Sequence, residues 1–161
     1  MSKWTRPTQP PPPLFLGEKE KNLVKQVNDE IIERVVGQQV LYFPIDIEHT
    51  NYHPLYGEAI EKNFLHPIRV FALVEYQGVE TSDMDNFALD KATKIKINFH
   101  KRRLTEDQNL FVREGDFVRF GEIYYEIVKV IEPKLLFGQP ESRFEIQAEC
   151  IRARDGLFNG E

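Results

Sequence analysis

Residues 113–131 read REGDFVRFGEIYYEIVKVI, and this stretch decides the expected fold. Two runs rich in aromatic and β-branched residues, 116–120 and 123–131, are separated by Gly121 and Glu122. Such runs on either side of a short turn with glycine are typical of neighbouring antiparallel strands. We therefore expect residues 116–131 to form a strand, a tight turn and a second strand.

Four further runs of strand character lie outside this stretch, at 39–43, 68–76, 94–99 and 143–151. The run 94–99 alternates strictly between polar and apolar residues, so one face should be buried and the other solvated. The connecting segments 44–67 and 77–93 are long, and we expect them to be loops. Six short strands with turn residues between them and one clear helix predict a mainly β fold, a small antiparallel β-barrel or sandwich.

The clear helix is expected at residues 18–36, where apolar residues recur at helical spacing: Leu23, Val24, Val27, Ile31, Ile32, Val35 and Val36. Gly37 follows as a C-cap. We expect the apolar stripe to pack on the sheet, because the polar face is mixed in sign, unlike the basic face of a membrane-surface helix. The chain thus divides into an extended arm (1–17), the amphipathic helix (18–37) and the β-barrel domain (38–161).

The amino-terminal arm is rich in proline, which favours an extended polyproline II conformation. One interpretation is a disordered or expression-related tail. The other is a stiff spacer with apolar anchors at both ends that lies on a neighbouring subunit. The second interpretation predicts inter-subunit contacts for Trp4, Pro10, Pro11, Pro12, Pro13, Leu14, Phe15 and Leu16.

The 161 residues are of a size for one domain and carry a net charge of −5, which argues against nonspecific gripping of nucleic acid. The basic excess is confined to one strand and its exit, where five bases occur without an acid: Lys94, Lys96, Lys101, Arg102 and Arg103. One interpretation is that these bases pair with nearby carboxylates, within the chain or across a subunit boundary. The other is local contact with DNA phosphates.

Catalytic signatures are missing from the sequence, with no nucleophile elbow, phosphate-binding glycine loop or dinucleotide fingerprint, and we expect no enzyme activity and no cofactor. His49 and His53 have the spacing of a zinc pair on a helix, but the segment ends on Pro54 and reads as a loop, so we expect no metal site.

The single cysteine, Cys150, cannot form an internal disulfide and indicates a reducing compartment. The sequence has no apolar run long enough for a membrane span and no signal peptide, which predicts synthesis in the cytoplasm.

The carboxy-terminal third resembles the neck, or head-completion, proteins of contractile-tailed bacteriophages. The shared pattern is a Glu-Gly-Asp turn (114–116), a strand, a turn, an aromatic-Glu-Ile strand, a Gly-Gln loop (138–139) and a strand ending near Cys150. Residues 52–58, YHPLYGE, resemble a loop motif of the same family. Together these segments cover about half of the chain, without the proline-rich arm and the helix.

The resemblance implies a structural virion protein of the neck, which joins the DNA-filled head to the tail as a closed ring, commonly six-fold, around a DNA channel. It implies a β-barrel body whose long loops contact the channel or adjacent rings, with the loop contacts at His53, Leu55, Tyr56, Gly57 and Glu58. The expected partners are further copies of this chain, adjacent neck, portal-side or tail proteins, and DNA that passes without sequence-specific binding, but no membrane.

Two other functions stay open at this point. The first is a small nucleic-acid-binding barrel that uses the basic strand 94–103, with Phe99 as a stacking surface. The second is a metal-dependent enzyme at His49 and His53.

Overall fold

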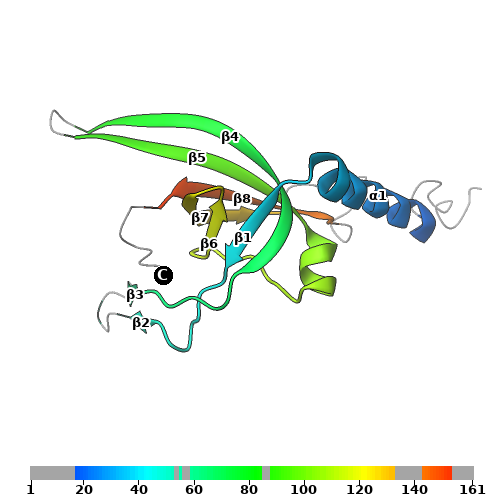
Figure 1. Cartoon of the computed structure of the whole chain (residues 1–161), viewed down its shortest axis with the longest axis horizontal. Coiled ribbons are helices and arrows are strands. Elements are labelled where there is room, and N and C mark those ends of the chain that lie inside the picture. Colours follow the sequence, from blue (N-terminus) through cyan, green and yellow to red (C-terminus); the bar gives the residue numbers. More distant parts are fainter. Residues whose placement is uncertain (1–16, 53–54, 56–58, 85–87, 133–142, 154–161) are drawn as a thin grey trace, which may run out of the picture.

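The computed structural model describes residues 17–52, 55, 59–84, 88–132 and 143–153. Its body is a closed antiparallel barrel, one of the two architectures that the sequence predicts, with the strand order β1-β4-β5-β8-β7-β6 and with β1 paired to β6 (Figure 1). The barrel strands are β1 (Gln39–Phe43), β4 (Ile68–Met84), β5 (Ala88–His100), β6 (Phe117–Phe120), β7 (Ile123–Ile131) and β8 (Glu145–Arg152).

The barrel interior follows the two-residue period of its strands. On β5, Ile95, Ile97 and Phe99 are fully buried, and they share the core with Val40 and Tyr42 of β1. The strict alternation in 94–99 thus correctly predicted one buried face. The β6–β7 hairpin expected from residues 113–131 is also confirmed, with Phe120 opposite Ile123 at its turn.

The segment 77–93 is not a loop. The pairing of β4 with β5 continues past the barrel to Met84 opposite Ala88, with an irregularity between Tyr76 and Gly78. We call the part of these strands beyond residue 76 of β4 and before residue 94 of β5 the projecting ribbon. Its sequence does not predict strands because it shows no apolar alternation, whereas its backbone is held by the ladder that begins inside the barrel.

The segment 44–67 includes two short paired strands, β2 (Asn51–Tyr52) and β3 (Ala59–Glu61), and otherwise remains a connection. It folds back onto the barrel through a bridge between Ile45 and Phe64, and the ring of Phe64 lies edge-on to Phe117 at 5.1 Å. The Lys62 ammonium lies 2.7 Å from the Glu126 carboxylate of β7. These contacts cover the outer side of β6.

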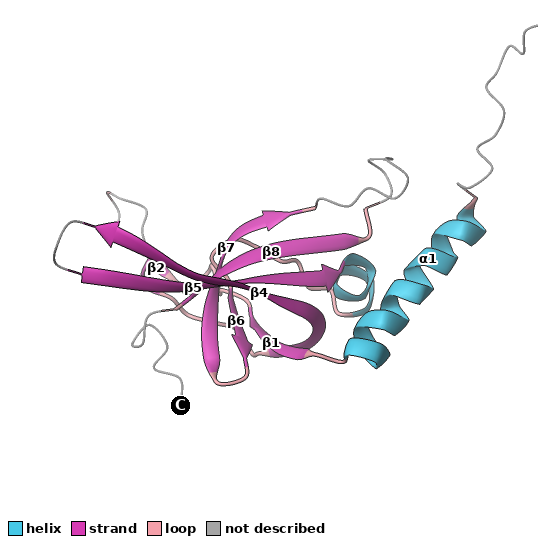
Figure 2. Cartoon of the chain, turned by 90° about the horizontal axis from the view of Figure 1, so that it is seen from above, coloured by secondary structure: helices cyan, strands magenta, loops and turns pink. Residues whose placement is uncertain are grey.

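The helix has the expected limits. It begins as α1 (Glu18–Glu30) and continues as the π-helical segment η1 (Ile31–Val36), ending at Gly37, whose φ of 60° suits a glycine C-cap. The Gly37 N–H donates to the Ile32 carbonyl five residues back. Figures 1 and 2 show α1 on one side of the barrel and the projecting ribbon on the other.

The expectation that the apolar stripe packs on the sheet is wrong. Leu23, Val27, Ile31 and Val35 are exposed by 60%, 47%, 45% and 75%. The helix instead turns Asp29 and Ile32 toward the barrel, where both are buried. None of the described helices is long and apolar enough to span a membrane.

Candidate functional site

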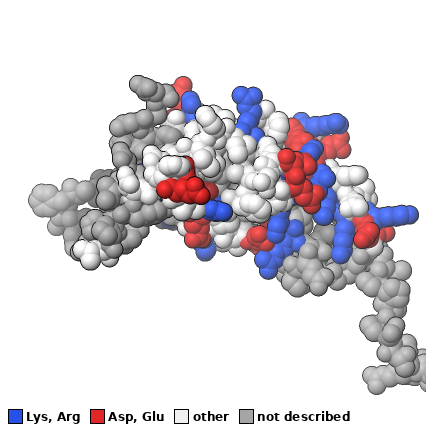
Figure 3. Space-filling view, turned by 90° about the horizontal axis from the view of Figure 1, so that it is seen from below, with Lys and Arg blue, Asp and Glu red and all other residues white. Residues whose placement is uncertain are grey.

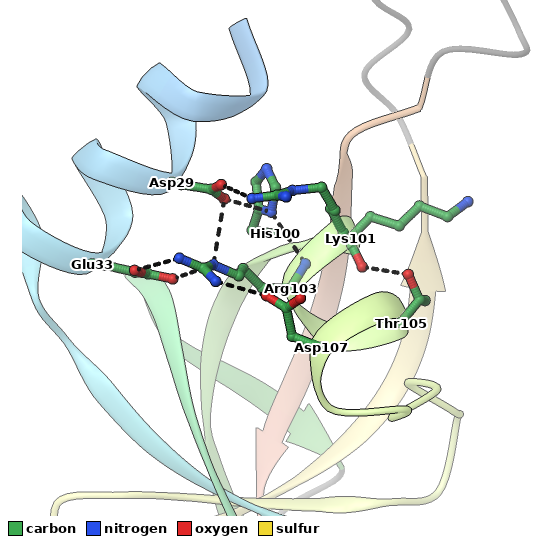
Figure 4. A network of polar contacts seen from close by, with 8 residues as sticks. Asp29, Glu33, His100, Lys101, Arg103, Thr105 and Asp107 are labelled. Carbon is green, nitrogen blue, oxygen red and sulfur yellow. Dashed lines mark hydrogen bonds and ion pairs between the residues drawn. The ribbon is translucent and has the colours of Figure 1, made fainter. Parts of the chain in front are cut away.

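The helix contacts the barrel through charged side chains at the end of β5 (Figure 4). The buried Asp29 carboxylate accepts a hydrogen bond from Arg102 and lies beside His100, whose Nδ1 is 2.9 Å from Oδ1. A carboxylate in such a position is stable only when cations or donors surround it. Asp29 therefore fixes α1 to the residues that follow β5.

Arg103 makes a second connection, between η1 and the short π-helical segment η2 (Arg103–Asp107). Its Nε lies 2.7 Å from Oε1 of Glu33 and its Nη2 lies 3.1 Å from Oε2, so two nitrogens of one guanidinium meet one carboxylate. Its Nη1 donates to Asp107 at 2.7 Å, and this hydrogen bond lowers the pKa of Asp107. We call Asp29, Glu33, His100, Arg102, Arg103 and Asp107 the charged junction.

His100 is the most deeply buried member of the charged junction, with 2% of its surface exposed. Burial lowers the pKa of His100, the carboxylate of Asp29 opposes this shift, and the charges of Arg102 and Arg103 reinforce it. A histidine with a lowered pKa is neutral near pH 7. The charged junction is therefore a structural connection in which the carboxylates and guanidinium groups carry the charge.

The face of the helix that points away from the charged junction carries exposed apolar side chains. Leu23, Val27, Ile31 and Val35 follow one another every four residues, and we call them the outward stripe. Four α-helical residues overshoot a full turn by about 40°, so the stripe drifts around the axis until the wider π turn of η1 reduces the drift. A row of apolar side chains on the side opposite the barrel is what an interface with another molecule requires.

The charged side chains are unevenly distributed over the surface. Figure 3 shows acidic and basic groups gathered at the end of the molecule that carries α1, whereas the rest of the described surface on this face is mostly uncharged. Opposite signs lie next to each other in this region, as the ion pairs of the charged junction require.

The predicted DNA contacts occupy two places on the structure. Lys94 and Lys96 lie on β5, where Lys96 is in register with Glu75 on one side and Glu149 on the other. Lys101, Arg102 and Arg103 follow the end of β5 and form ion pairs with Glu132, Asp29 and Glu33, respectively. The interpretation of local pairing with carboxylates thus describes these last three bases, and DNA contact by the five residues stays a prediction.

The proposed stacking role of Phe99 is wrong, because its ring is fully buried in the barrel core and packs edge-on against Tyr42. Alternation along 94–99 places position 99 on the same inward face as 95 and 97. A base cannot reach that ring in the folded chain.

Most residues predicted to contact neighbours lie outside the described part of the chain. These are the arm residues Trp4, Pro10, Pro11, Pro12, Pro13, Leu14, Phe15 and Leu16 and the loop residues His53, Tyr56, Gly57 and Glu58. Leu55 is described and is 82% exposed, which agrees with a loop position on the surface.

His49 belongs to a tight polar turn. Its Nδ1 lies 2.7 Å from Oδ2 of Asp46, and the other oxygen of Asp46 accepts from the backbone N–H groups of Glu48 and His49. His53 lies outside the described residues, and no group of three or more potential metal ligands occurs within them.

Asp29 and Glu33 are the functional residues that sequence reasoning missed. The available signal was their spacing of four, which places both carboxylates on one helical face, together with the acid-free run that follows β5. Matching that acidic face to the basic run would have predicted which side of the helix faces the barrel.

Comparisons with known proteins found a similarity among solved structures and none among family models or curated proteins. No protein-family model matches the chain, and no curated protein matches it. Among solved structures, a chain of the "Virion of native gene transfer agent (GTA) particle" is similar over 72% of this chain and 94% of that chain, at 11% identity and a TM-score of 0.48.

Proposed function

We propose that this chain is a structural virion protein that forms a ring in the neck of a phage-like particle, between the DNA-filled head and the tail. The outward stripe carries the proposal. An isolated subunit gains nothing from exposing Leu23, Val27, Ile31 and Val35 while it buries Asp29. A ring subunit has a neighbour on each side, and one of them can cover the stripe.

The projecting ribbon supports the same proposal. Strand β1 pairs with β4 only as far as Gln39 opposite Phe71, and β8 pairs with β5 only as far as Lys94 opposite Ile151. Beyond these points the described ribbon strands pair only with each other. Two-stranded ribbons are marginally stable alone in water, so contact with the channel or an adjacent ring would stabilise this one.

The remaining parts of the proposal follow from the sequence resemblance of the carboxy-terminal third and of residues 52–58 to phage neck proteins. We expect six copies around a DNA channel, contacts with neighbouring neck, portal-side or tail proteins, assembly in the host cytoplasm and no enzymatic activity. The net charge of −5 fits a ring that surrounds DNA without holding it, because strong phosphate binding requires an overall basic surface.

The test is the mass of the purified full-length chain in solution, measured by light scattering and native mass spectrometry. We expect a ring for the natural chain and monomers for the double variant Val27→Glu and Ile31→Glu, because two carboxylates in an apolar interface would have to be desolvated. Both residues are exposed in the subunit, so the variant should keep its fold.

Gln26→Glu is the matched control, since Gln26 is exposed on the same helix but lies off the stripe. It should leave the ring intact. A natural chain that stays monomeric at high concentration and is absent from purified particles would refute the proposal.

The nucleic-acid-binding barrel is less well supported. It needs a free basic strand and an accessible aromatic ring, whereas Phe99 is buried and Arg102 and Arg103 are bound to carboxylates.

A further inference from the structure

A basic hollow lies next to the charged junction, between α1, η2 and the start of β8. It has a volume of about 190 Å³ and is lined by Lys25, Lys101, Arg102, Thr105, Glu106, Arg143 and Phe144. The four basic residues come from three parts of the sequence, so only the fold brings them together. Lys25 and Arg143 were not among the predicted DNA contacts.

The cations around the hollow outnumber the carboxylates that hold them. Glu132 serves two of them, with one oxygen 3.1 Å from both Lys101 Nζ and Arg143 Nη1. Asp29, which holds Arg102, also contacts His100 and Arg103. Each cation therefore has unused hydrogen-bond capacity, because a lysine has three donors and an arginine five.

Two groups at the hollow have no partner in the described part of the chain. Lys25 forms no ion pair there, and the Nε of Arg102 is buried without a hydrogen-bond partner. A buried guanidinium nitrogen without an acceptor is costly, and an anion in the hollow would add a counter-charge beside the Arg102 guanidinium. Glu106 is the carboxylate on the lining itself, so the four basic residues leave the lining positive.

Glu132 organises the cations without neutralising them completely. Partial burial by itself would raise the pKa of Glu132, but hydrogen bonds from Lys101 and Arg143 outweigh burial and lower it. An ionised Glu132 holds these two side chains at the rim of the hollow. Preorganised cations lose less side-chain entropy when a ligand arrives.

We propose that this hollow binds a phosphate group, and that the group belongs to the DNA backbone. Arginine and lysine together suit a tetrahedral anion, since a guanidinium presents paired donors and an ammonium a point charge. The assignment to DNA rests on the proposed neck function, whereas the assignment to a phosphate group rests on the hollow alone. A single local site of this kind would guide DNA through an otherwise acidic ring without holding it.

The experiment compares two probes on the purified full-length chain: inorganic phosphate, followed by thermal stabilisation, and a fluorescent duplex DNA, followed by anisotropy over a series of salt concentrations. The test variant is Lys25→Gln with Arg143→Gln. The control variant is Lys19→Gln with Arg69→Gln, which removes the same charges from exposed positions away from the hollow.

We expect the test variant to lose the phosphate-induced stabilisation and about tenfold in DNA affinity. The slope of log K against log salt should be smaller by about 1 to 2, because each cation that neutralises a DNA phosphate contributes about one to that slope. The control should keep both properties. Phosphate binding without DNA binding would support the site and overturn DNA as its source. Equal losses in both variants, or no binding of either probe, would overturn the site.

The mass of each variant separates this inference from the proposed function. Lys25 and Arg143 lie off the outward stripe, so both double variants should form the same ring as the natural chain. A ring that binds neither probe would refute the phosphate site alone, whereas a monomeric natural chain would refute the neck ring.

Discussion

His100 is the residue whose environment departs most from what its sequence position indicates. On the alternating strand 94–99 and its exit it reads as an ordinary histidine, but the fold buries it between Asp29 of the helix and the two arginines that follow it. Docking of the helix that carries Asp29 buries His100 and lowers its pKa, and the sequence alone does not specify this long-range contact.

Acidification should destabilise the fold through His100. Its pKa is lowered in the folded chain, so below its ordinary value of 6.5 the unfolded chain takes up the proton first, and the free energy of unfolding decreases as pH falls. One group contributes a slope of at most about 1.4 kcal/mol per pH unit. Urea unfolding on both sides of pH 6.5 measures this slope.

The matched variants are His100→Gln, which should remove this part of the slope, and His49→Gln, which should retain it because His49 lies in an exposed turn. An identical pH dependence in the natural chain and His100→Gln would contradict the argument.

Asp116 shows what a local motif can and cannot predict. In the sequence, Asp116 closes the Glu-Gly-Asp turn at 114–116, and the structure gives this aspartate a structural role. Asp116 accepts hydrogen bonds from the Tyr42 hydroxyl and from the Ile45 N–H, at 2.9 Å for the latter. Burial raises the pKa of Asp116. The turn is evident from the sequence, but its partner, 74 residues away, is not.

At the scale of elements, the helix is held by its polar side. An amphipathic helix normally packs its apolar face on the core, and that rule predicts the wrong orientation. Here Asp29 and Glu33 meet Arg102 and Arg103, and Ile32 is the buried apolar contact of the helix. Docking of the helix on its own barrel is therefore mainly electrostatic.

Asp29→Asn should weaken this docking strongly. The change removes the charge that faces Arg102, Arg103 and His100, and leaves the partly buried Arg102 without a counterion. We expect a loss of about 2–4 kcal/mol, between that of a charged hydrogen bond and that of a buried ion pair. Chemical unfolding measures the loss, and hydrogen exchange shows whether it is concentrated in α1.

Glu30→Gln is the neighbouring control. Its ion pair with Arg34 is exposed on both sides, so removal should change stability by less than about 0.5 kcal/mol. Similar losses in the two variants would mean that the charged junction does not hold the helix.

Some strands are predicted by their residue pattern, whereas others form only because they pair with a neighbouring strand. Runs such as 39–43 and 123–131 have the aromatic and β-branched residues of buried strands, and their limits were correct. The projecting ribbon has no such pattern, because it does not cover a core of this chain. Its strand structure comes from the ladder that continues out of the barrel, past Gly78 with a φ of 102°.

At the scale of the whole molecule, barrel closure can be tested with the single cysteine. Cys150 lies on β8, is 1% exposed, and has its pKa raised to about 12 by burial. The natural chain should therefore resist thiol reagents until the barrel unfolds, because the thiolate is the reactive form. The rate of labelling with and without denaturant measures this protection.

A chain with Cys150→Ala and Gln26→Cys provides the comparison, since position 26 is exposed on the helix and should react at once. Rapid labelling of Cys150 under native conditions would mean that the barrel opens between β5, β7 and β8, the strands that surround it.

The π turn of η1 has a consequence for how the subunit can change by insertion or deletion. An α-helical residue turns the chain by about 100° and a residue of the wider π turn by less, and the helix is connected to the barrel through the short stretch between Glu33 and Gln39. Removal of two residues there would rotate the preceding helix by roughly half a turn and bring Val27 and Ile31 over the barrel. The length of that stretch therefore determines, as much as its composition does, which face of the helix contacts the barrel and which face is exposed.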